Sequence, residues 1–182
     1  MTADLSALFG RLVRDVADFP TPGVVFKDVS PLLADPEGFR EVVAALAGPG
    51  RSADGSTAVD KVVGLEARGF IFGAPVALEL GTGFVPIRKA GKLPAATHRV
   101  SYTLEYGEAV LEMHRDAVAP GERVLVVDDV LATGGTAAAA RTLVEAAGGT
   151  VTALSVLLEL EFLDGRAALD GTDVRALSVV LK

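Results

Sequence analysis

VLVVDDVLATGGT, residues 124–136, is the stretch that best predicts the fold of this chain. Residues 124–127 form a short aliphatic and β-branched run, which is typical of a buried strand. Two acids follow it, and small residues then lead into an Ala-rich segment that predicts a helix over residues 136–147. Strand, glycine turn and helix in that order are the repeating unit of parallel sheets covered by helices.

The same alternation continues on both sides of this stretch. Further strands are predicted at residues 62–65, 84–88, 109–114, 151–158 and 174–179, with a helix near residues 69–80. Asp35 as N-cap and Pro36 as the first helical residue predict another helix, reaching about residue 46. Residues 91–107 have no clean periodicity and are expected to form a long loop. The sequence thus predicts an α/β fold, a mostly parallel sheet flanked by helices, in one domain of 182 residues.

Composition narrows the classes of function. The chain has no cysteine and two histidines, which excludes disulfides, thiolate chemistry and a histidine-based metal site. Its net charge of -7 argues against nucleic-acid binding. Apolar runs are broken by charge, as at Glu159 and Glu161, and the N-terminus resembles an amphipathic helix more than a signal peptide. We therefore expect a cytoplasmic protein with no membrane partner that acts on small molecules.

Residues 128–136 contain the groups needed to bind a phosphorylated sugar. The free N–H groups at a helix start, the helix dipole and threonine hydroxyls suit a phosphate, and glycine permits its close approach. Paired carboxylates at a strand end suit ribose hydroxyls or Mg²⁺. The alternative is an ordinary turn with solvated acids; a Walker loop is excluded because no lysine follows the second glycine. The candidates are Asp128, Asp129, Thr133, Gly134, Gly135 and Thr136.

This stretch resembles the motif that binds phosphoribosyl pyrophosphate (PRPP) in type I phosphoribosyltransferases. The resemblance implies that Ala132–Thr136 anchor the 5′-phosphate and that Asp128 and Asp129 bind the ribose. It also implies Mg²⁺ carried by PRPP, with Asp128 or Asp129 as a possible ligand. In the hypoxanthine-guanine branch the position of Ala132 is usually an aspartate that handles a purine proton, so a proton-handling group must here come from elsewhere.

Residues 19–31, FPTPGVVFKDVSP, together with Gly69-Phe70 and residues 91–94, resemble adenine phosphoribosyltransferases over nearly the whole chain. The resemblance implies a small N-terminal hood over the base, formed mainly by residues 1–35. It implies main-chain contacts from Val25 and Lys27 to adenine, with Phe26 and Leu160 on its two faces. Lys27 stands where a relative can carry arginine, which a main-chain contact tolerates. The alternative is an extended Pro-bounded segment with Phe26 in the core.

Two further segments supply the remaining candidates. Residues 66–69, EARG, resemble the pyrophosphate loop of the family, where relatives often have a cis peptide, here between Glu66 and Ala67. Basic residues at the mouth of the sheet suit a leaving diphosphate, and the candidates are Arg68, Arg88, Lys89 and Lys92. The alternative is that they are solvated surface residues, as most basic residues are. Residues 101–107, SYTLEYG, resemble the mobile catalytic loop, which implies Glu105 as the proton-handling group.

The resemblance implies a magnesium-dependent homodimer in purine salvage that converts adenine and PRPP into AMP and pyrophosphate. Two alternatives stay open at this point. One is transfer to xanthine or another base, because Ala132 does not exclude every other branch. The other is a PRPP-sensing transcriptional regulator without catalysis, which would be expected to carry a basic DNA-binding module; the segment before Phe19 is short and mixed in charge.

Overall fold

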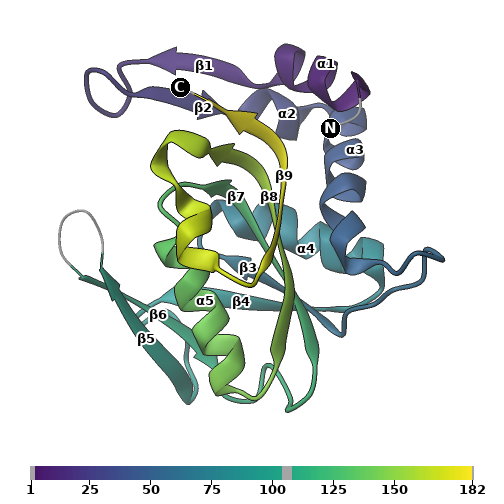
Figure 1. Ribbon diagram of the computed structural model, residues 1–182, viewed down its shortest axis with the longest axis vertical. Helices are drawn as coiled ribbons and strands as arrows, with labels where there is room; N and C mark the ends of the chain where they lie inside the picture. The colour runs from purple at the N-terminus through teal and green to yellow at the C-terminus, as the bar shows by residue number, and fades with distance from the viewer. Residues whose placement is uncertain (1–2, 104–107, 182) are drawn as a thin grey trace. The chain divides into compact units, whose positions relative to one another are not determined.

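The computed structural model describes residues 3–103 and 108–181 (Figure 1). These residues divide into two compact units, Met1–Ala45 and Leu46–Lys182. The expected hood of residues 1–35 lies inside the first unit, and a single domain that includes it stays a prediction. No helix in the described part of the chain is long and apolar enough to cross a membrane.

The described part of the first unit has three helices and a two-stranded sheet, and the last helix, α3, continues two residues past the boundary at Ala45. Its elements are α1 (Ala3–Leu12), β1 (Arg14–Ala17), β2 (Val25–Asp28), α2 (Ser30–Ala34) and α3 (Pro36–Ala47). The strands β1 and β2 are antiparallel, with Arg14 opposite Asp28. The predicted start of α3 is confirmed, because Asp35 Oδ1 accepts a hydrogen bond from the N–H of Gly38 at 2.7 Å.

At the end of β2, hydrogen bonds from Ser30 and Arg14 lower the pKa of Asp28 to about 2.

The second unit is built on a seven-stranded sheet of order β5-β6-β4-β3-β7-β8-β9. The strands are β3 (Lys61–Leu65), β4 (Gly83–Lys89), β5 (Thr97–Thr103), β6 (Glu108–His114), β7 (Arg123–Leu131), β8 (Thr150–Leu160) and β9 (Asp173–Val180). Neighbours among β4, β3, β7, β8 and β9 are parallel, whereas β5 and β6 form an antiparallel pair at one edge. The mostly parallel sheet is confirmed, and each strand that was predicted is present.

The helices α4 (Arg68–Leu80) and α5 (Gly135–Ala146) cover opposite faces of this sheet (Figure 1). Alternation along β3 explains the two faces. Val63 and Leu65 belong to the core cluster that contains the buried residues of α5. Gly64 points the other way, and a Cβ there would come within 3.1 Å of the carbonyl oxygen of Gly69 in α4. The missing side chain therefore lets α4 lie directly against the strand. The described residues of the unit also form three short 3₁₀ helices: η1 (Gly48–Gly50), η2 (Glu161–Leu163) and η3 (Gly165–Leu169).

The expectation of a long loop over residues 91–107 is wrong for most of the described part of that segment. Thr97–Thr103 is the strand β5, paired with β6 from Thr97 opposite His114 to Thr103 opposite Glu108. Val100 and Tyr102 are the apolar residues of its described part that pack against the core, and both are only partly buried. A strand with one solvated face alternates apolar and polar residues, and Val100 and Tyr102 do alternate with Arg99, Ser101 and Thr103. Two apolar residues give a short and weak alternation, which is easily taken for a loop.

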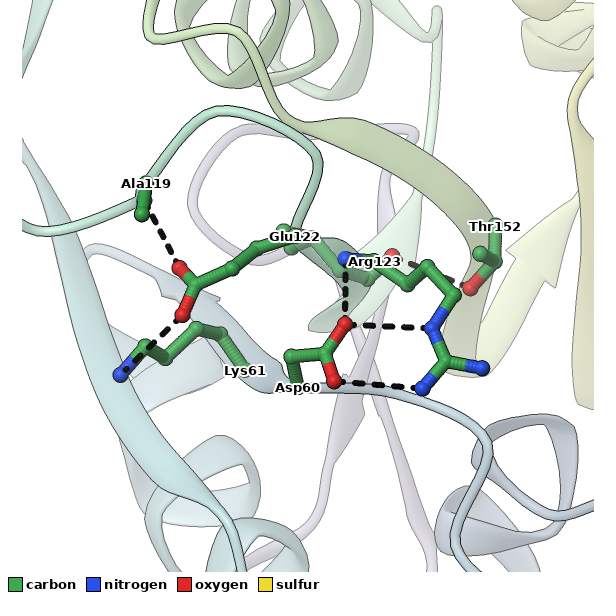
Figure 2. A network of polar contacts seen from close by, with 7 residues as sticks. Asp60, Lys61, Ala119, Glu122, Arg123 and Thr152 are labelled. Carbon is green, nitrogen blue, oxygen red and sulfur yellow. Dashed lines mark hydrogen bonds and ion pairs between the residues drawn. The ribbon is translucent and has the colours of Figure 1, made fainter.

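The amino ends of β3 and β7 are joined by a polar network, drawn in Figure 2. Asp60 accepts hydrogen bonds from Arg123, at 2.8 Å from the main-chain N–H and at 3.1 and 3.2 Å from the guanidinium. Beside them Lys61 pairs with Glu122 at 3.8 Å, and Glu122 accepts the N–H of Ala119 at 2.8 Å. This network aligns two central strands at the end opposite to the predicted site.

Candidate active site

The carboxyl ends of the parallel strands carry most of the predicted site residues of the second unit. Because parallel strands point the same way, residues after β3, β4, β7 and β8 meet at one edge of the sheet, where ligands bind in open α/β folds. This edge brings together Arg68 after β3, Arg88 and Lys89 at the end of β4, the stretch 128–136 along and after β7, and Leu160 at the end of β8.

The loop between β7 and α5 has the geometry of an anion site. Gly134 precedes the helix with φ of 82°, a left-handed conformation that favours glycine, and α5 starts at Gly135 with no acid in its first turn. The first N–H groups of a helix have no partner within it and lie at the positive end of its dipole. This loop lines a pocket together with Asp128. The Thr136 hydroxyl lies 3.3 Å from the Tyr102 hydroxyl, so β5 contacts the loop as well.

The two acids of the site are close to each other and differ in their surroundings. Asp129 is nearly buried, and its Oδ2 lies 2.7 Å from Nε of Arg68. This contact is an ion pair without hydrogen-bond alignment, since Oδ2 has no hydrogen-bond partner within the described ranges. Asp128 Oδ1 accepts the N–H of Asp129 at 2.9 Å. Burial raises the pKa of Asp128 well above its ordinary value, and the negative charge of Asp129 raises it further.

Arg68 is positioned by the start of α4. The peptide bond between Glu66 and Ala67 is cis, as the family resemblance implied. The helix then begins at Arg68, and its second residue is Gly69, where a Cβ would lie 2.7 Å from Asp128 Oδ1. Only glycine lets the start of α4 come this close to the acids, and Arg68 is thereby held beside Asp129.

Glu66 organises the basic residues at the end of β4. Its carboxylate accepts hydrogen bonds from the Arg88 guanidinium at 3.2 Å and from the N–H of Lys89 at 2.9 Å. Burial would raise the pKa of Glu66, but the N–H of Lys89 and the charge of Arg88 lower it instead. Arg88 also donates to the carbonyl oxygen of Lys92 at 3.2 Å and lies 5.9 Å from the ring centre of Phe70. Lys92 is thus brought to this cluster through its main chain.

A second buried acid, Glu112 on β6, holds the turn before Lys92. Its Oε2 accepts the N–H of Gly91 at 2.9 Å, and its Oε1 pairs with Nε of Arg99 on β5 at 2.8 Å. Sequence reasoning missed both Glu66 and Glu112. Each acid is far from its arginine in the sequence and meets it only in the folded chain, because the two partners come from different parts of the sheet.

The base-contacting candidates belong to two different units. Val25, Phe26 and Lys27 lie on β2 of the first unit, where Phe26 packs edge-on against Phe19 at 5.2 Å and Lys27 Nζ pairs with Asp15 at 2.6 Å. Residues two apart on a strand direct their main-chain N–H and C=O groups to the same edge of that strand. The main-chain groups of Val25 and Lys27 therefore lie on one edge of β2. Leu160 ends β8 in the second unit. Glu105 lies outside the described residues, and its role stays a prediction.

Comparison with known proteins gives one consistent family. The model of the phosphoribosyl transferase domain matches residues 29–177. An adenine phosphoribosyltransferase of Nocardioides is 62% identical over 169 residues, which cover 93% of this chain and 91% of the relative. That of Thermobifida fusca is 60% identical over 180 residues, covering 99% of this chain and 100% of the relative.

Solved structures agree with this result. The adenine phosphoribosyltransferase of Thermoanaerobacter pseudethanolicus is 48% identical with a TM-score of 0.89, covering 97% of this chain and 99% of that one. The enzyme of Saccharomyces cerevisiae, solved with adenine and an imino-altritol bisphosphate, is 38% identical with a TM-score of 0.91, again covering 97% and 99%.

Proposed function

This chain belongs to the adenine phosphoribosyltransferases of the phosphoribosyl transferase family, and we propose that it transfers the phosphoribosyl group of PRPP to adenine, giving AMP and pyrophosphate. The observation that carries the proposal is the continuous unit of residues 128–136, in which an acid pair near the carboxyl end of β7 is followed by a helix start with the geometry of an anion site. Its place in metabolism is the salvage of a free purine base.

The 5′-phosphate would bind in the loop from Ala132 to Thr136, against the free N–H groups at the start of α5. The acids Asp128 and Asp129 would then lie beside the ribose, where they accept hydrogen bonds from its hydroxyls. Chemistry at the anomeric carbon develops positive charge on the sugar ring. Two carboxylates placed there in advance favour that charge more in the transition state than in the ground state.

The leaving pyrophosphate would be neutralised by Arg68, Arg88, Lys89 and Lys92. Glu66 supports this role by fixing the Arg88 guanidinium and the main chain of Lys89. Arg68 connects the two halves of the site, because it pairs with Asp129 at 2.7 Å while belonging to the pyrophosphate loop. An incoming diphosphate offers Arg68 a stronger anion than one carboxylate, which would free Asp129 for the ribose.

Adenine would be read by the main chain of Val25 and Lys27 and packed between Phe26 and Leu160. Adenine presents an N1 acceptor beside an N6 donor, and a main-chain N–H beside a C=O matches that pair. Ala132 has no proton to exchange, so we assign the proton at the purine N7 to Glu105.

Magnesium fits the acids at this site as a partner of the substrate. The described residues contain no cluster of three or more His, Cys, Asp or Glu side chains that could hold a metal ion. Mg²⁺ commonly binds one or two carboxylates together with substrate phosphates, and Asp128 or Asp129 can supply such a carboxylate. A bound Mg²⁺ would neutralise the charge of the diphosphate.

A homodimer and a cytoplasmic location also stay predictions. Sedimentation equilibrium tests the dimer.

A competition between bases tests the proposal. We would measure kcat/KM with PRPP for adenine, hypoxanthine, guanine and xanthine, in the natural chain and in Lys27→Ala. A site whose buried groups match one hydrogen-bonding pattern rejects the wrong base by about 10,000-fold, so adenine should dominate by that order. Lys27→Ala should keep the preference, because the proposed reader is the main chain.

Comparable use of hypoxanthine or xanthine would contradict the choice of adenine and leave the PRPP site standing. Binding of PRPP without turnover of any base would favour a sensor over an enzyme. The double variant Asp128→Asn/Asp129→Asn should lose at least ~100-fold in kcat/KM while remaining folded by circular dichroism.

A further inference from the structure

The phosphate loop lies against η3, a short 3₁₀ helix over Gly165–Leu169, with the main chains of the two close together. Gly134 and Gly165 face each other there. A Cβ on Gly134 would overlap the carbonyl oxygen of Gly165 and come 2.9 Å from the Cβ of Ala168. A Cβ on Gly165 would overlap the carbonyl oxygen of Ala132 and come 3.0 Å from Cγ of Leu131. The position of the loop therefore depends on the position of η3.

One arginine ties η3 to two strands of the sheet. Arg166 donates hydrogen bonds from Nε and NH2 to the two carboxylate oxygens of Glu159 on β8, both at 2.7 Å. Its NH1 donates to the carbonyl oxygen of Val174 on β9 at 3.1 Å. A 3₁₀ helix of five residues has poor internal hydrogen bonding, so its place is set mainly by such contacts. A two-bond arginine fork fixes direction as well as distance.

The pair is asymmetric in its burial. The Glu159 side chain is 6% exposed, whereas that of Arg166 is 50% exposed. A buried carboxylate requires a partner, and Arg166 is the guanidinium that reaches it from η3. The far end of the segment is held separately, by hydrogen bonds from Arg141 of α5 to the carbonyl oxygen of Asp170 at 3.0 Å and to the Thr172 hydroxyl at 2.9 Å.

We infer that Arg166 is a positioning residue for the 5′-phosphate site: anchored on Glu159, it presses η3 against residues 132–134 and thereby sets the loop that receives the phosphate. Arg166 acts through main-chain contacts and does not itself touch the ligand in this scheme. The inference rests on the proposed function in identifying the loop as the 5′-phosphate site.

The inference makes a prediction that distinguishes ligands by their chemistry. AMP and PRPP carry a 5′-phosphate, whereas inorganic pyrophosphate occupies only the region of Arg68 and Arg88. We would titrate each of the three ligands into the natural protein, Arg166→Lys and Arg166→Gln by isothermal calorimetry with Mg²⁺ present. Displacing a binding loop by about 1 Å can cost up to about 100-fold, so AMP and PRPP should weaken roughly 10- to 100-fold in both variants. Pyrophosphate should stay within about twofold, because its proposed contacts lie on α4, on β4 and in the turn after β4.

Arg175→Gln is the matched control. Arg175 pairs with Asp173 at 2.8 Å on β9, and both side chains are largely exposed, at 64% and 48%. Its removal should leave all three affinities unchanged. Arg166→Lys keeps a positive charge near Glu159 and loses the fork, so it provides the folded variant for the test if Arg166→Gln does not fold.

The double variant Glu159→Gln/Arg166→Gln tests whether the two residues act as one unit. Its loss of AMP affinity should equal that of Arg166→Gln, and losses that multiply would contradict the pair. Natural-sequence affinity for AMP in both Arg166 variants overturns the inference, and so does an equal loss of all three ligands, which indicates general loosening. Failure of the natural protein itself to bind PRPP contradicts the proposed function instead.

Discussion

Gly134→Ala should damage the phosphate loop in two separable ways. Gly134 has a φ of 82°, and an alanine in this region costs about 1–2 kcal/mol of backbone strain. The new Cβ would also overlap the carbonyl oxygen of Gly165 and lie 2.9 Å from the Cβ of Ala168, and crowding of this kind costs about 1–3 kcal/mol more. We therefore expect a loss of about 2–5 kcal/mol in the free energy of unfolding, which a domain of ordinary stability survives.

Gly121→Ala separates strain from crowding. Gly121 has a φ of 86°, and nothing lies within 4 Å of an added Cβ, so this variant should lose only the strain term. Urea unfolding followed by circular dichroism gives both free energies, and calorimetry gives the affinity for PRPP. Gly134→Ala should be less stable than the control by about 1–3 kcal/mol and should bind PRPP up to about 100-fold more weakly. Equal stability and natural affinity in both variants would refute the close packing of the loop on η3.

Three further outcomes are expected. Because the pKa of Asp128 is raised, its ionised form destabilises the ligand-free protein. The free energy of unfolding of the ligand-free protein should thus fall as the pH rises above about 3.9, by at most about 1.4 kcal/mol per pH unit. Urea unfolding at a series of pH values measures this fall, and Asp128→Asn should remove it. Glu105→Gln should lower kcat roughly 100- to 10,000-fold with a smaller effect on PRPP affinity; steady-state kinetics that show the reverse would make Glu105 a binding residue. Hydrogen bonds from Arg123 lower the pKa of Asp60, so the stability it contributes is present above about pH 4 and is lost as the pH falls through that lowered pKa. Asp60→Asn should consequently lower Tm at neutral pH and converge with the natural protein in acid, and a Tm gap that persists in acid would exclude the ion pair as its cause.

The parts of this protein that could be predicted are those in which neighbours in sequence are also neighbours in space. The strand, acid pair and helix start of residues 124–136 form one continuous segment, and the structure contains them in that order. The strand is longer than predicted, because β7 continues through both acids to Leu131. The start of α3 at Pro36 is equally local, because Asp35 caps the helix that follows it. The strand β5 was missed, since the two partly buried apolar residues of its described part, Val100 and Tyr102, make a short and weak alternation.

The supporting acids could not be predicted, because their partners are assigned by topology. Glu66 meets Arg88 only because β3 and β4 are parallel neighbours that end together. Glu159 interrupts an apolar run and in sequence indicates an exposed position, whereas the folded chain buries it beside Arg166. An acid inside an apolar run, followed six and seven residues later by glycine and arginine, is the one local signal that could have suggested this pair.

The hydroxyl contact between Tyr102 and Thr136 gives this protein an optical reporter of its own site. The chain has no tryptophan and two tyrosines, and Tyr102 is the one within the described residues. Its phenol lies 3.3 Å from the side chain of a loop residue assigned to the phosphate. The emission of a phenol depends on its hydrogen bonding, so ligand entry at Thr136 should change the ultraviolet fluorescence of the unlabelled protein. Tyr106→Phe isolates that signal, and rapid mixing with AMP would then time the arrival of a phosphate without any dye.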